Sequence, residues 1–475
     1  MKKHFLLYLL SIALLLNSCS KDDSNGNNQD QTINAINSFI WKGLNNYYLW
    51  QSSVPDLSDR KFSTTQQLND FLNGFSDSKT LFESLLYQKG TIDKWSWIVD
   101  DYIALEQSFQ GTTETTGMEF GLKLFNNNNS KVFGFVRYVV PNTDAATKGV
   151  KRGMIFTEIN GTPITRDNYR SLLFSNAKSY TIHLADYNNG DPITNSTTFN
   201  LTKSSFTENP IHVAKTINDN GKKIGYLLYN SFTSNFDTQL NQAFAKFKTD
   251  AINDLIIDLR YNGGGSVNSA TRLASMVTGQ FTGDVFAKQR WNEKYMKVVN
   301  PNSLINTFPN KIDTETINSL NLTNIYFITT DGSASASELI INGLKPHINV
   351  KTVGTKTHGK YAGSITLYDS PKLYSKEGIN PNHKWAMQPI VLEIVNKNNF
   401  NDKDGIEPDV ELKEDFGNLG ILGDINEPLL KRTLEFINTG SKSIHYKQSK
   451  IIEHTTIGSS KSNNPTYNNM YVDLN

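Results

Sequence analysis

A regular alternation of short apolar runs and amphipathic segments between residues 210 and 437 constrains the fold of this chain most strongly. The run 254–259 is apolar and of strand length, whereas 235–250 repeats apolar residues at the three- and four-residue spacing of a helix. Strands that alternate with helices indicate an α/β core. We therefore expect strands at 223–229, 254–259, 324–329 and 351–354, and helices at 235–250, 267–278 and 337–347.

The predicted strand at 254–259 is followed by three glycines, Gly263 to Gly265. Because glycine lacks a Cβ, such a loop brings backbone N–H groups close to whatever binds there. The triplet lacks the Gly-Lys-Ser/Thr ending of a phosphate-binding Walker loop, which argues against nucleotide binding. We expect Asp258 and Arg260, at the strand end, to hold this loop rather than to perform chemistry.

A serine-rich segment at 331–338 and the lysine at position 360 are the main candidates for catalysis. The Ser335 hydroxyl is a poor nucleophile until a base removes its proton, and the Lys360 amine can be that base if burial lowers its pKa towards neutrality. The helix predicted directly behind Ser335 would present N-terminal amides to a developing oxyanion. Glu338 falls in the first turn of this helix, where its charge suits the helix dipole.

These segments, in this order, resemble the carboxy-terminal processing (tail-specific) serine peptidases. The family motif DLRxNxGG matches residues 258–265, and the family motif TxGK matches the residues that end at Lys360. The family's nucleophile lies in a SASE motif, and its distance from the family's lysine fits this chain when Ser335, rather than Ser333 or Ser337, is the nucleophile. A later Gly-Ile-x-Pro-Asp motif matches 405–409. The resemblance implies that Ser335 attacks, that Lys360 is the general base, and that the amides of Ala336 and of a glycine near Gly264 form the oxyanion hole. It also implies a crotonase/ClpP-like core without a metal or organic cofactor.

Two positions near Lys360 leave the site open to other interpretations. Many family members carry a glutamine four residues after the lysine, which helps to orient it, whereas this chain has Ser364, whose reach is shorter. His358 lies two residues before Lys360, and on an extended segment both side chains would point to the same face. A Ser335–His358 pair therefore stays open, although no acidic residue is visibly placed to orient the imidazole. No cluster has the spacing of a zinc site.

In residues 113–207 the sequence pattern is one of short β runs separated by turns, and this region resembles a PDZ domain. Within them, Asn160-Gly161 is a strong two-residue hairpin turn. A PDZ domain adds an extended peptide to its sheet as a strand and holds a C-terminal carboxylate on backbone amides. A β-domain with a purely structural role is the alternative. By analogy, the residues expected to line the carboxylate loop are Met118, Glu119, Phe120 and Gly121.

The N-terminus has the order of a bacterial export signal, with Lys2 and Lys3 before the apolar run 5–16. The segment 16–19 resembles a lipobox, which would make Cys19 the lipidated first residue of the mature protein. Cys19 is the only cysteine, so an intramolecular disulfide is impossible. We expect an outer-membrane lipoprotein, and the acidic residues after Cys19 resemble a surface-export signal. An ordinary cleaved leader is the alternative.

The 475 residues are thus predicted to form a multidomain α/β protein with a crotonase/ClpP-like peptidase core, a PDZ-like β-domain and a small N-terminal helical domain. A net charge of +1 without a basic block argues against nucleic acid as a partner. The predicted divisions are a signal peptide at 1–18, a flexible tether at 19–32, the helical domain at 33–112, the PDZ-like domain at 113–207, the peptidase core at 208–438 and a polar, loosely ordered tail at 439–475.

The expected function is that of a lipid-anchored serine endopeptidase that cleaves protein or peptide substrates engaged through the PDZ-like domain. A catalytically silent, peptide-binding surface lipoprotein on the same fold is one alternative, which the serine at position 364 keeps open. An acyl-transfer or thioester enzyme on the crotonase-like fold is another, but such an enzyme would not need the pair of Ser335 and Lys360.

Overall fold

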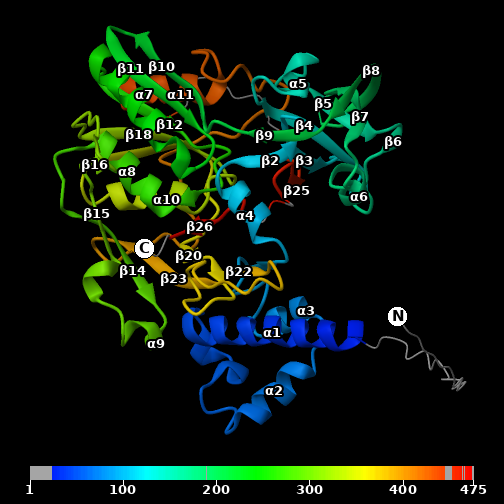
Figure 1. Cartoon of the computed structure of the whole chain (residues 1–475). Coiled ribbons are helices and arrows are strands. Elements are labelled where there is room, and N and C mark those ends of the chain that lie inside the picture. Colours follow the sequence, from blue (N-terminus) through cyan, green and yellow to red (C-terminus); the bar gives the residue numbers. More distant parts are fainter. Residues whose placement is uncertain (1–23, 189, 444–451, 463, 465, 473–475) are drawn as a thin grey trace, which may run out of the picture.

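A six-stranded sheet lies at the centre of the computed structural model, which describes residues 24–188, 190–443, 452–462, 464 and 466–472 (Figure 1). The first two strands of this sheet form an antiparallel hairpin, and all further pairs are parallel. In spatial order the strands are β10 (Ile211–Asp219), β11 (Lys222–Tyr229), β12 (Asp254–Asp258), β18 (Asn324–Thr329), β19 (Asn349–Gly354) and β24 (Val410–Glu411).

Helices cover both faces of this sheet. On one face, α7 (Asp237–Asp250), α8 (Val267–Val277) and α10 (Ala336–Leu344) share a core with Ile257 of β12. On the other face, α11 (Pro428–Thr439) packs in a core with Ile256. Strands that are buried on both faces are apolar throughout, which is why β12 was recognisable in the sequence. The predicted order of strands and helices is confirmed, with ends that shift by a few residues.

A second six-stranded sheet lies beyond α8 and α10, on the side away from the central sheet (Figure 1). Contacts of α10 with β19 of the central sheet and with β23 of the second sheet make this helix the layer between them. In spatial order the strands are β13 (Gly265–Ser266), β26 (Met470–Tyr471), β20 (Ala362–Ser364), β23 (Ile390–Asn396), β14 (Val285–Trp291) and β15 (Ile305–Thr307).

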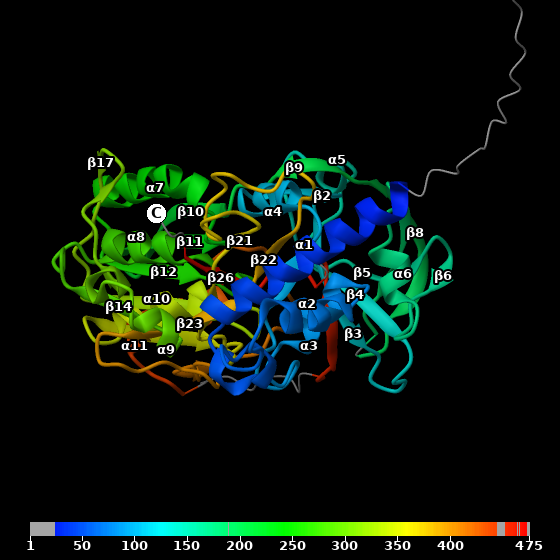
Figure 2. The same cartoon turned by 60° about the horizontal axis from the view of Figure 1, so that its bottom comes forward.

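The N-terminal region is helical, as predicted, and packs beneath the second sheet (Figures 1 and 2). Its buried side chains belong to the same continuous hydrophobic core as those of α8 and α10, and the amide of Leu49 donates to the carbonyl of Ile390 on β23 at 2.9 Å. Over the described residues, no helix has the length and apolar character needed to cross a membrane. The helices are α1 (Ser24–Tyr47), α2 (Thr65–Asn73), α3 (Ser78–Ser84) and α4 (Tyr102–Phe109).

A seven-stranded antiparallel sheet with its own core forms the region after α4. Asn160 and Gly161 both have positive φ, at 52° and 75°, and Ile159 pairs with Thr162 across them, so the predicted hairpin turn is confirmed. The strands are β3 (Met118–Leu124), β4 (Val132–Val139), β5 (Ile155–Ile159), β6 (Thr162–Pro163), β7 (Ser179–Asp186), β8 (Ile193–Thr202) and, from the C-terminal segment, β25 (Thr456–Ser459).

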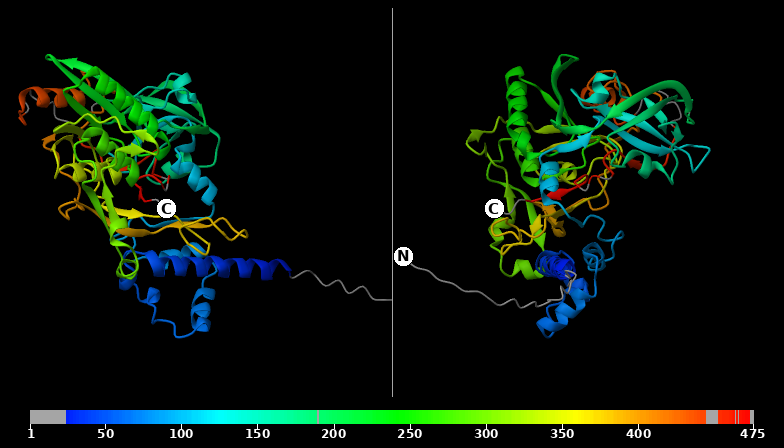
Figure 3. Two further views of the ribbon diagram at one scale, coloured as in Figure 1. Left: turned by 60° about the vertical axis from the view of Figure 1, so that its left-hand side comes forward. Right: turned by 45° about the vertical axis from the view of Figure 1, so that its right-hand side comes forward.

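The prediction of a loosely ordered tail after residue 439 is wrong for the described part of this segment. β25 adds to the free edge of β3, and β26 lies between β13 and β20. Figure 3 shows this segment, in red, running from the seven-stranded sheet into the centre of the molecule. The prediction failed because strand pairing uses backbone amides and carbonyls, which polar residues supply as well as apolar ones.

Candidate active site

Ser335 stands directly before the first residue of α10 in an unusual backbone conformation, with φ at 67° and ψ at −117°. A residue other than glycine at positive φ stores about 1–3 kcal/mol of strain, and such residues gather at functional sites. The side chain is fully buried, and its Oγ has no hydrogen-bond partner among the described residues. Ala336 follows as the first helical residue, so the Ser335 hydroxyl lies at the N-terminal end of the helix, as predicted.

The neighbouring serines are engaged elsewhere. Ser333 Oγ donates to the carbonyl of Leu259 at 2.7 Å, and Ser337 Oγ donates to the carbonyl of Asn262 at 2.9 Å. Both hydroxyls therefore brace the loop that follows β12. Of the three serines in this segment, only Ser335 keeps a hydroxyl without a described partner, which agrees with the choice of Ser335 as the nucleophile.

Lys360 is buried, with 2% of its surface exposed. Burial lowers the pKa of its amine to about 7, against the opposing influence of the Asp93 and Glu338 carboxylates. The Nζ atom donates to the carbonyl of Asn468 at 2.6 Å and lies 5.6 Å from the centre of the Trp95 ring. A lysine in this state is neutral over part of the physiological pH range, which is the property that a general base requires.

The Glu338 carboxylate joins the loop of the serine to the loop of the lysine. Its Oε2 accepts from the amides of Ser335 and Lys360, both at 2.8 Å. Its Oε1 accepts from Thr357 Oγ1 and from the Gly359 amide, both at 2.6 Å. Burial raises the pKa of Glu338, and these four bonds oppose that shift. Sequence reasoning assigned Glu338 only to the helix dipole, although a glutamate three residues after a helix-starting serine also fits the capping-box pattern.

The glycine loop after β12 lies against Ser335. Gly264 has φ at 111°, and a Cβ built on it would come within 2.7 Å of Ser335 Oγ, so only glycine fits there. The amide of Gly264 donates to Asn262 Oδ1 at 2.9 Å. The next amide, that of Gly265, donates to the carbonyl of Asn469 at 2.7 Å. The loop thus holds a peptide carbonyl beside the serine, which is the close backbone approach predicted for the triplet.

An ion cluster around the fully buried Arg260 fixes the start of the glycine loop. The guanidinium of Arg260 bonds to Asp258 Oδ2 at 2.7 Å and to Glu427 Oε1 at 2.6 Å, and lies 3.3 Å from Glu414 Oε1. The positions of Asp258 and Arg260 confirm that they hold the loop. The sequence showed no sign of Glu427 and Glu414, because both come from segments more than 150 residues further along the chain.

The two possible orienting residues do not contact the Lys360 amine through any described hydrogen bond. His358 is exposed whereas Lys360 is buried, and the segment that carries them is not a strand, so the expectation that an extended segment points both side chains to one face is wrong. Partial burial of the ring, followed by the nearby charge of Lys360, lowers the pKa of His358. Ser364 Oγ instead lies 2.7 Å from Gln388 Oε1 and 3.0 Å from Asn469 Oδ1, and its single proton is donated to one of these acceptors at a time.

The four residues expected to line a carboxylate loop lie on β3, in the seven-stranded sheet. Met118 and Phe120 are buried in the core of this sheet. The outer edge of β3 pairs with β25, with Gly121 opposite Ser459. Next to this edge, Ser460 Oγ donates to Glu119 Oε2 at 2.6 Å.

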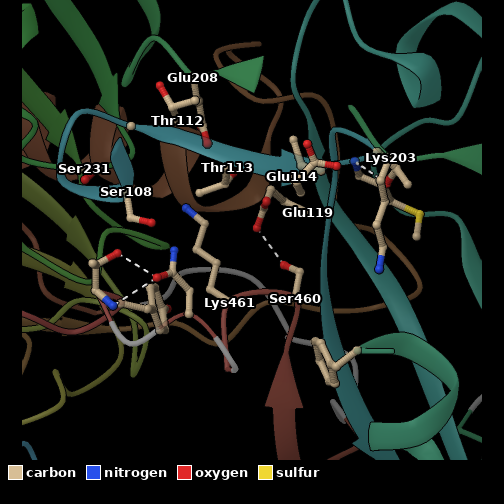
Figure 4. A pocket seen from close by; sticks show the side chains of 18 of the residues that line it. Ser108, Thr112, Thr113, Glu114, Glu119, Lys203, Glu208, Ser231, Ser460 and Lys461 are labelled. Atoms are coloured by element: carbon tan, nitrogen blue, oxygen red, sulfur yellow. Dashed lines mark hydrogen bonds between the residues drawn. The ribbon is translucent and has the colours of Figure 1, made fainter. Parts of the chain in front are cut away.

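A cavity of about 780 Å³ lies between the edge of β3 and the glycine loop. Figure 4 shows that its wall carries Glu114, Glu119 and Glu208 together with Lys203 and Lys461. Gly263, Gly264 and Asn468 also line it, so the cavity opens beside the candidate nucleophile. Cys19 lies outside the described residues.

Comparison with protein-family models matches residues 223–412 to the peptidase family S41 and residues 35–97 to the peptidase S41 N-terminal domain. The first match contains the glycine loop, Ser335 and Lys360. The chain belongs to peptidase family S41. The resemblance to the carboxy-terminal processing peptidases that was inferred from the motifs is thereby confirmed, and the S41 match spans the α/β core as far as β24.

Curated relatives of this S41 chain include a probable CtpA-like serine protease of Staphylococcus haemolyticus, which is 26% identical over 188 residues, or 38% of this chain and 35% of the relative. A carboxyl-terminal-processing protease of Picosynechococcus is 24% identical over 211 residues, or 41% of this chain and 46% of the relative. The matched region thus spans about a third to a half of these relatives.

Solved structures share the multidomain α/β fold. A putative S41 protease from Bacteroides fragilis has a TM-score of 0.66 at 23% identity, with 85% of this chain and 97% of that chain covered. The photosystem II D1 C-terminal processing protease has a TM-score of 0.50 at 17% identity and the same two coverages. These likenesses concern the fold.

Proposed function

We propose that this chain is a serine endopeptidase in which Ser335 is the nucleophile and Lys360 is the general base. The observation that carries the proposal is the state of Lys360: a buried amine with a pKa of about 7, whose loop shares the Glu338 carboxylate with the loop of Ser335. A neutral amine can take a proton from a hydroxyl, and a strained, unpartnered serine beside a helix N-terminus suits nucleophilic attack. The CtpA-like and carboxyl-terminal-processing relatives agree with this chemistry.

In the proposed reaction, Ser335 Oγ attacks the carbonyl carbon of the scissile peptide while Lys360 Nζ accepts the hydroxyl proton. The negative charge that develops on the carbonyl oxygen is stabilised by backbone amides at the start of α10 and in the glycine loop, with Ala336 and Gly264 as the predicted pair. The Gly264 amide would exchange its bond to Asn262 Oδ1 for one to this oxygen. Lys360 then gives the proton to the leaving amine, which frees the C-terminal product. Water, deprotonated by Lys360, hydrolyses the ester on Ser335 and releases the second product.

The core that carries these residues is proposed to be crotonase/ClpP-like, and residues 113–207 are proposed to act as a PDZ-like domain that captures substrate. Support for this capture comes from the edge of β3, which pairs with the short strand β25 through backbone hydrogen bonds and through side chains such as Lys123, whose Nζ donates to Thr456 Oγ1. An edge of this kind accepts peptides of varied sequence by strand addition. The cavity beside this edge extends to Gly264, which lies against Ser335, and would bring a captured chain close to the nucleophile.

The location proposed for the enzyme is the outer membrane, through a lipid on Cys19. The lipobox-like segment 16–19 supports an anchored protein. Residues 24–32, which were predicted to belong to a flexible tether, are part of helix α1 instead, because the helix starts earlier than the apolar pattern indicated. At the outer membrane the peptidase would meet unfolded or extended segments of proteins in the cell envelope, and these are the proposed substrates.

The proposal is tested by incubating the full-length chain, purified in mild detergent, with an unfolded protein such as casein. The wild-type chain is expected to produce fragments, and the Ser335→Ala variant is expected to produce none above background. An active Ser335→Ala variant would contradict the assignment, and an inactive wild-type chain that binds casein would favour the silent, peptide-binding alternative.

A further inference from the structure

The described residues of the C-terminal segment 455–472, which are 455–462, 464 and 466–472, contact both surfaces at which we propose that a substrate binds. At the first surface, the Leu124 amide donates to the carbonyl of Thr455 at 3.0 Å, and the Ser460 amide donates to the carbonyl of Phe120 at 2.9 Å. These bonds flank β25 on both sides and continue its pairing with β3. The segment therefore occupies the sheet edge in the manner of an added peptide strand.

At the second surface, the same segment lies beside the nucleophile. The Asn469 carbonyl accepts from the Gly265 amide at 2.7 Å, and a Cβ on Gly264 would come within 2.8 Å of that carbonyl oxygen and 2.7 Å of Ser335 Oγ. Gly264 lies against Ser335, and the next residue, Gly265, binds the Asn469 peptide group. Segment 455–472 thus places a peptide group beside the nucleophile, on the amide that follows Gly264.

The docked segment also engages the candidate base. The Lys360 amine donates to the Asn468 carbonyl, whereas Ser335 Oγ has no described partner. In this arrangement the lysine has no hydrogen bond to the hydroxyl that it must deprotonate. The segment therefore bonds to the candidate base itself, through the peptide group next to the one that it places beside Ser335.

Lys461 anchors the stretch between the two surfaces. Its Nζ lies 3.0 Å from Tyr138 Oη, and Tyr138 Oη in turn donates to Glu208 Oε1 at 3.2 Å. Figure 4 shows Lys461 and Ser460 beside Glu119, whose Oε2 accepts from Ser460 Oγ. The cation of the segment is thus set between two carboxylates of the body, and this electrostatic contact depends on the sign of its charge.

We infer that segment 455–472 is an intramolecular occupant of the substrate path, which competes with protein substrates for the β3 edge and for the Ser335 site. The inference rests on the proposed function for the identity of this path. When a binding site is free for only a fraction of the time, the apparent affinity for an outside ligand falls by that fraction. Releasing the segment is therefore expected to tighten substrate binding and to raise kcat/KM through a lower KM.

The test compares Lys461→Glu with Lys297→Glu. The second variant is a matched charge reversal at an exposed lysine that belongs to neither surface. Lys461→Glu places a third negative charge beside Glu119 and Glu208 and should release the segment. Binding of fluorescent casein is measured with full-length chains that also carry Ser335→Ala, so that cleavage does not interfere. Hydrogen exchange at the amides of Leu124 and Gly265 reports whether the segment has left.

The expected result is that Lys461→Glu exposes both amides and binds casein about tenfold more tightly than the parent, as for a site that is free about a tenth of the time. Lys297→Glu should behave as the parent. If both amides exchange faster but the affinity for casein is unchanged, the inference is overturned, because releasing the segment has not freed a binding site. If casein binds more tightly while both amides stay protected, the inference is also overturned, because the gain does not come from release of the segment. If binding tightens but no chain with Ser335 intact cleaves casein, the inference stands and the proposed catalysis fails.

Discussion

The backbone amide of Lys360 donates a 2.8 Å hydrogen bond to Glu338 Oε2, which ties the loop of the candidate base to the first turn of the helix that begins at the nucleophile. All four described partners of the Glu338 carboxylate are donors. The spacing of the serine and lysine loops therefore depends on a side chain that itself performs no proton transfer. Glu338 is a positioning residue.

Glu338→Gln is expected to lower kcat/KM about 10- to 100-fold, because the amide NH₂ would face donors that need an acceptor, at a cost of about 1–3 kcal/mol. The charge of Glu338 raises the pKa of Lys360, so its removal should also shift the midpoint of the pH–rate profile to lower pH. A merely structural defect would leave that midpoint unchanged. Glu315→Gln, at an exposed glutamate, is the control and should match the wild type in both rate and midpoint.

Lys360 sets the predicted pH dependence of the reaction. Its pKa of about 7 means that the amine is mostly protonated below pH 7 and mostly neutral above it. Activity should therefore rise about tenfold per pH unit below 7 and level off above, as measured by kcat/KM on an unfolded protein. A rate that falls through this range would contradict the assignment of Lys360 as the base.

Substitutions at positions 358 and 360 separate the lysine mechanism from the histidine mechanism. Lys360→Arg should be almost as inactive as Lys360→Ala, because a guanidinium stays protonated. His358→Ala should keep substantial activity, since the imidazole is exposed and has no described contact with Ser335 Oγ. An inactive His358→Ala beside an active Lys360→Ala would reverse this assignment.

The buried guanidinium of Arg260 is predicted to matter for stability. Arg260→Ala would leave Asp258 and Glu427 as buried carboxylates without their partner, which typically costs about 3–5 kcal/mol. The free energy of unfolding, measured by urea denaturation, should fall by that amount. Lys431→Ala, at an exposed residue of α11, should change it by less than about 0.5 kcal/mol.

Anchoring is predicted to depend on one residue. Wild-type chain produced in a Gram-negative host should carry lipid on Cys19 and sediment with the outer membrane. Cys19→Ala should lack lipid and be either released or left unprocessed. Metabolic labelling with a fatty acid, followed by fractionation, tests both statements, and an unlabelled wild-type chain in the soluble fraction would reject the lipoprotein prediction.

The parts of the fold that could be predicted are those with a local cause. The middle of β12, Leu255 to Ile257, is apolar because both faces of the strand are covered, and the Asn160–Gly161 turn follows from two positive φ values. Ser335 and Lys360 were identified from short motifs, and each is buried at the site those motifs implied. In these cases the residues next to each feature in the sequence are enough to determine its structure.

The parts that were missed depend on contacts between distant segments. β26 is a two-residue strand at the end of a largely polar segment, and it pairs with β13 and β20 while Met470 and Val472 pack into the main hydrophobic core. So short an apolar stretch gives no strand signal in the sequence. The segment that carries His358 and Lys360 is not a strand, which sequence alternation does not reveal. The role of Glu338 appears only when the loop of Lys360 folds back onto α10.

The central claim is tested most directly by comparing three serine-to-alanine variants, because only Ser335 has a hydroxyl without a described partner, whereas those of Ser333 and Ser337 bond to backbone carbonyls. Cleavage of an unfolded protein is measured for each purified full-length chain. The account predicts that Ser335→Ala loses several orders of magnitude in kcat, while Ser333→Ala and Ser337→Ala keep most of theirs. Full activity in Ser335→Ala, with loss in either of the other two, would contradict it.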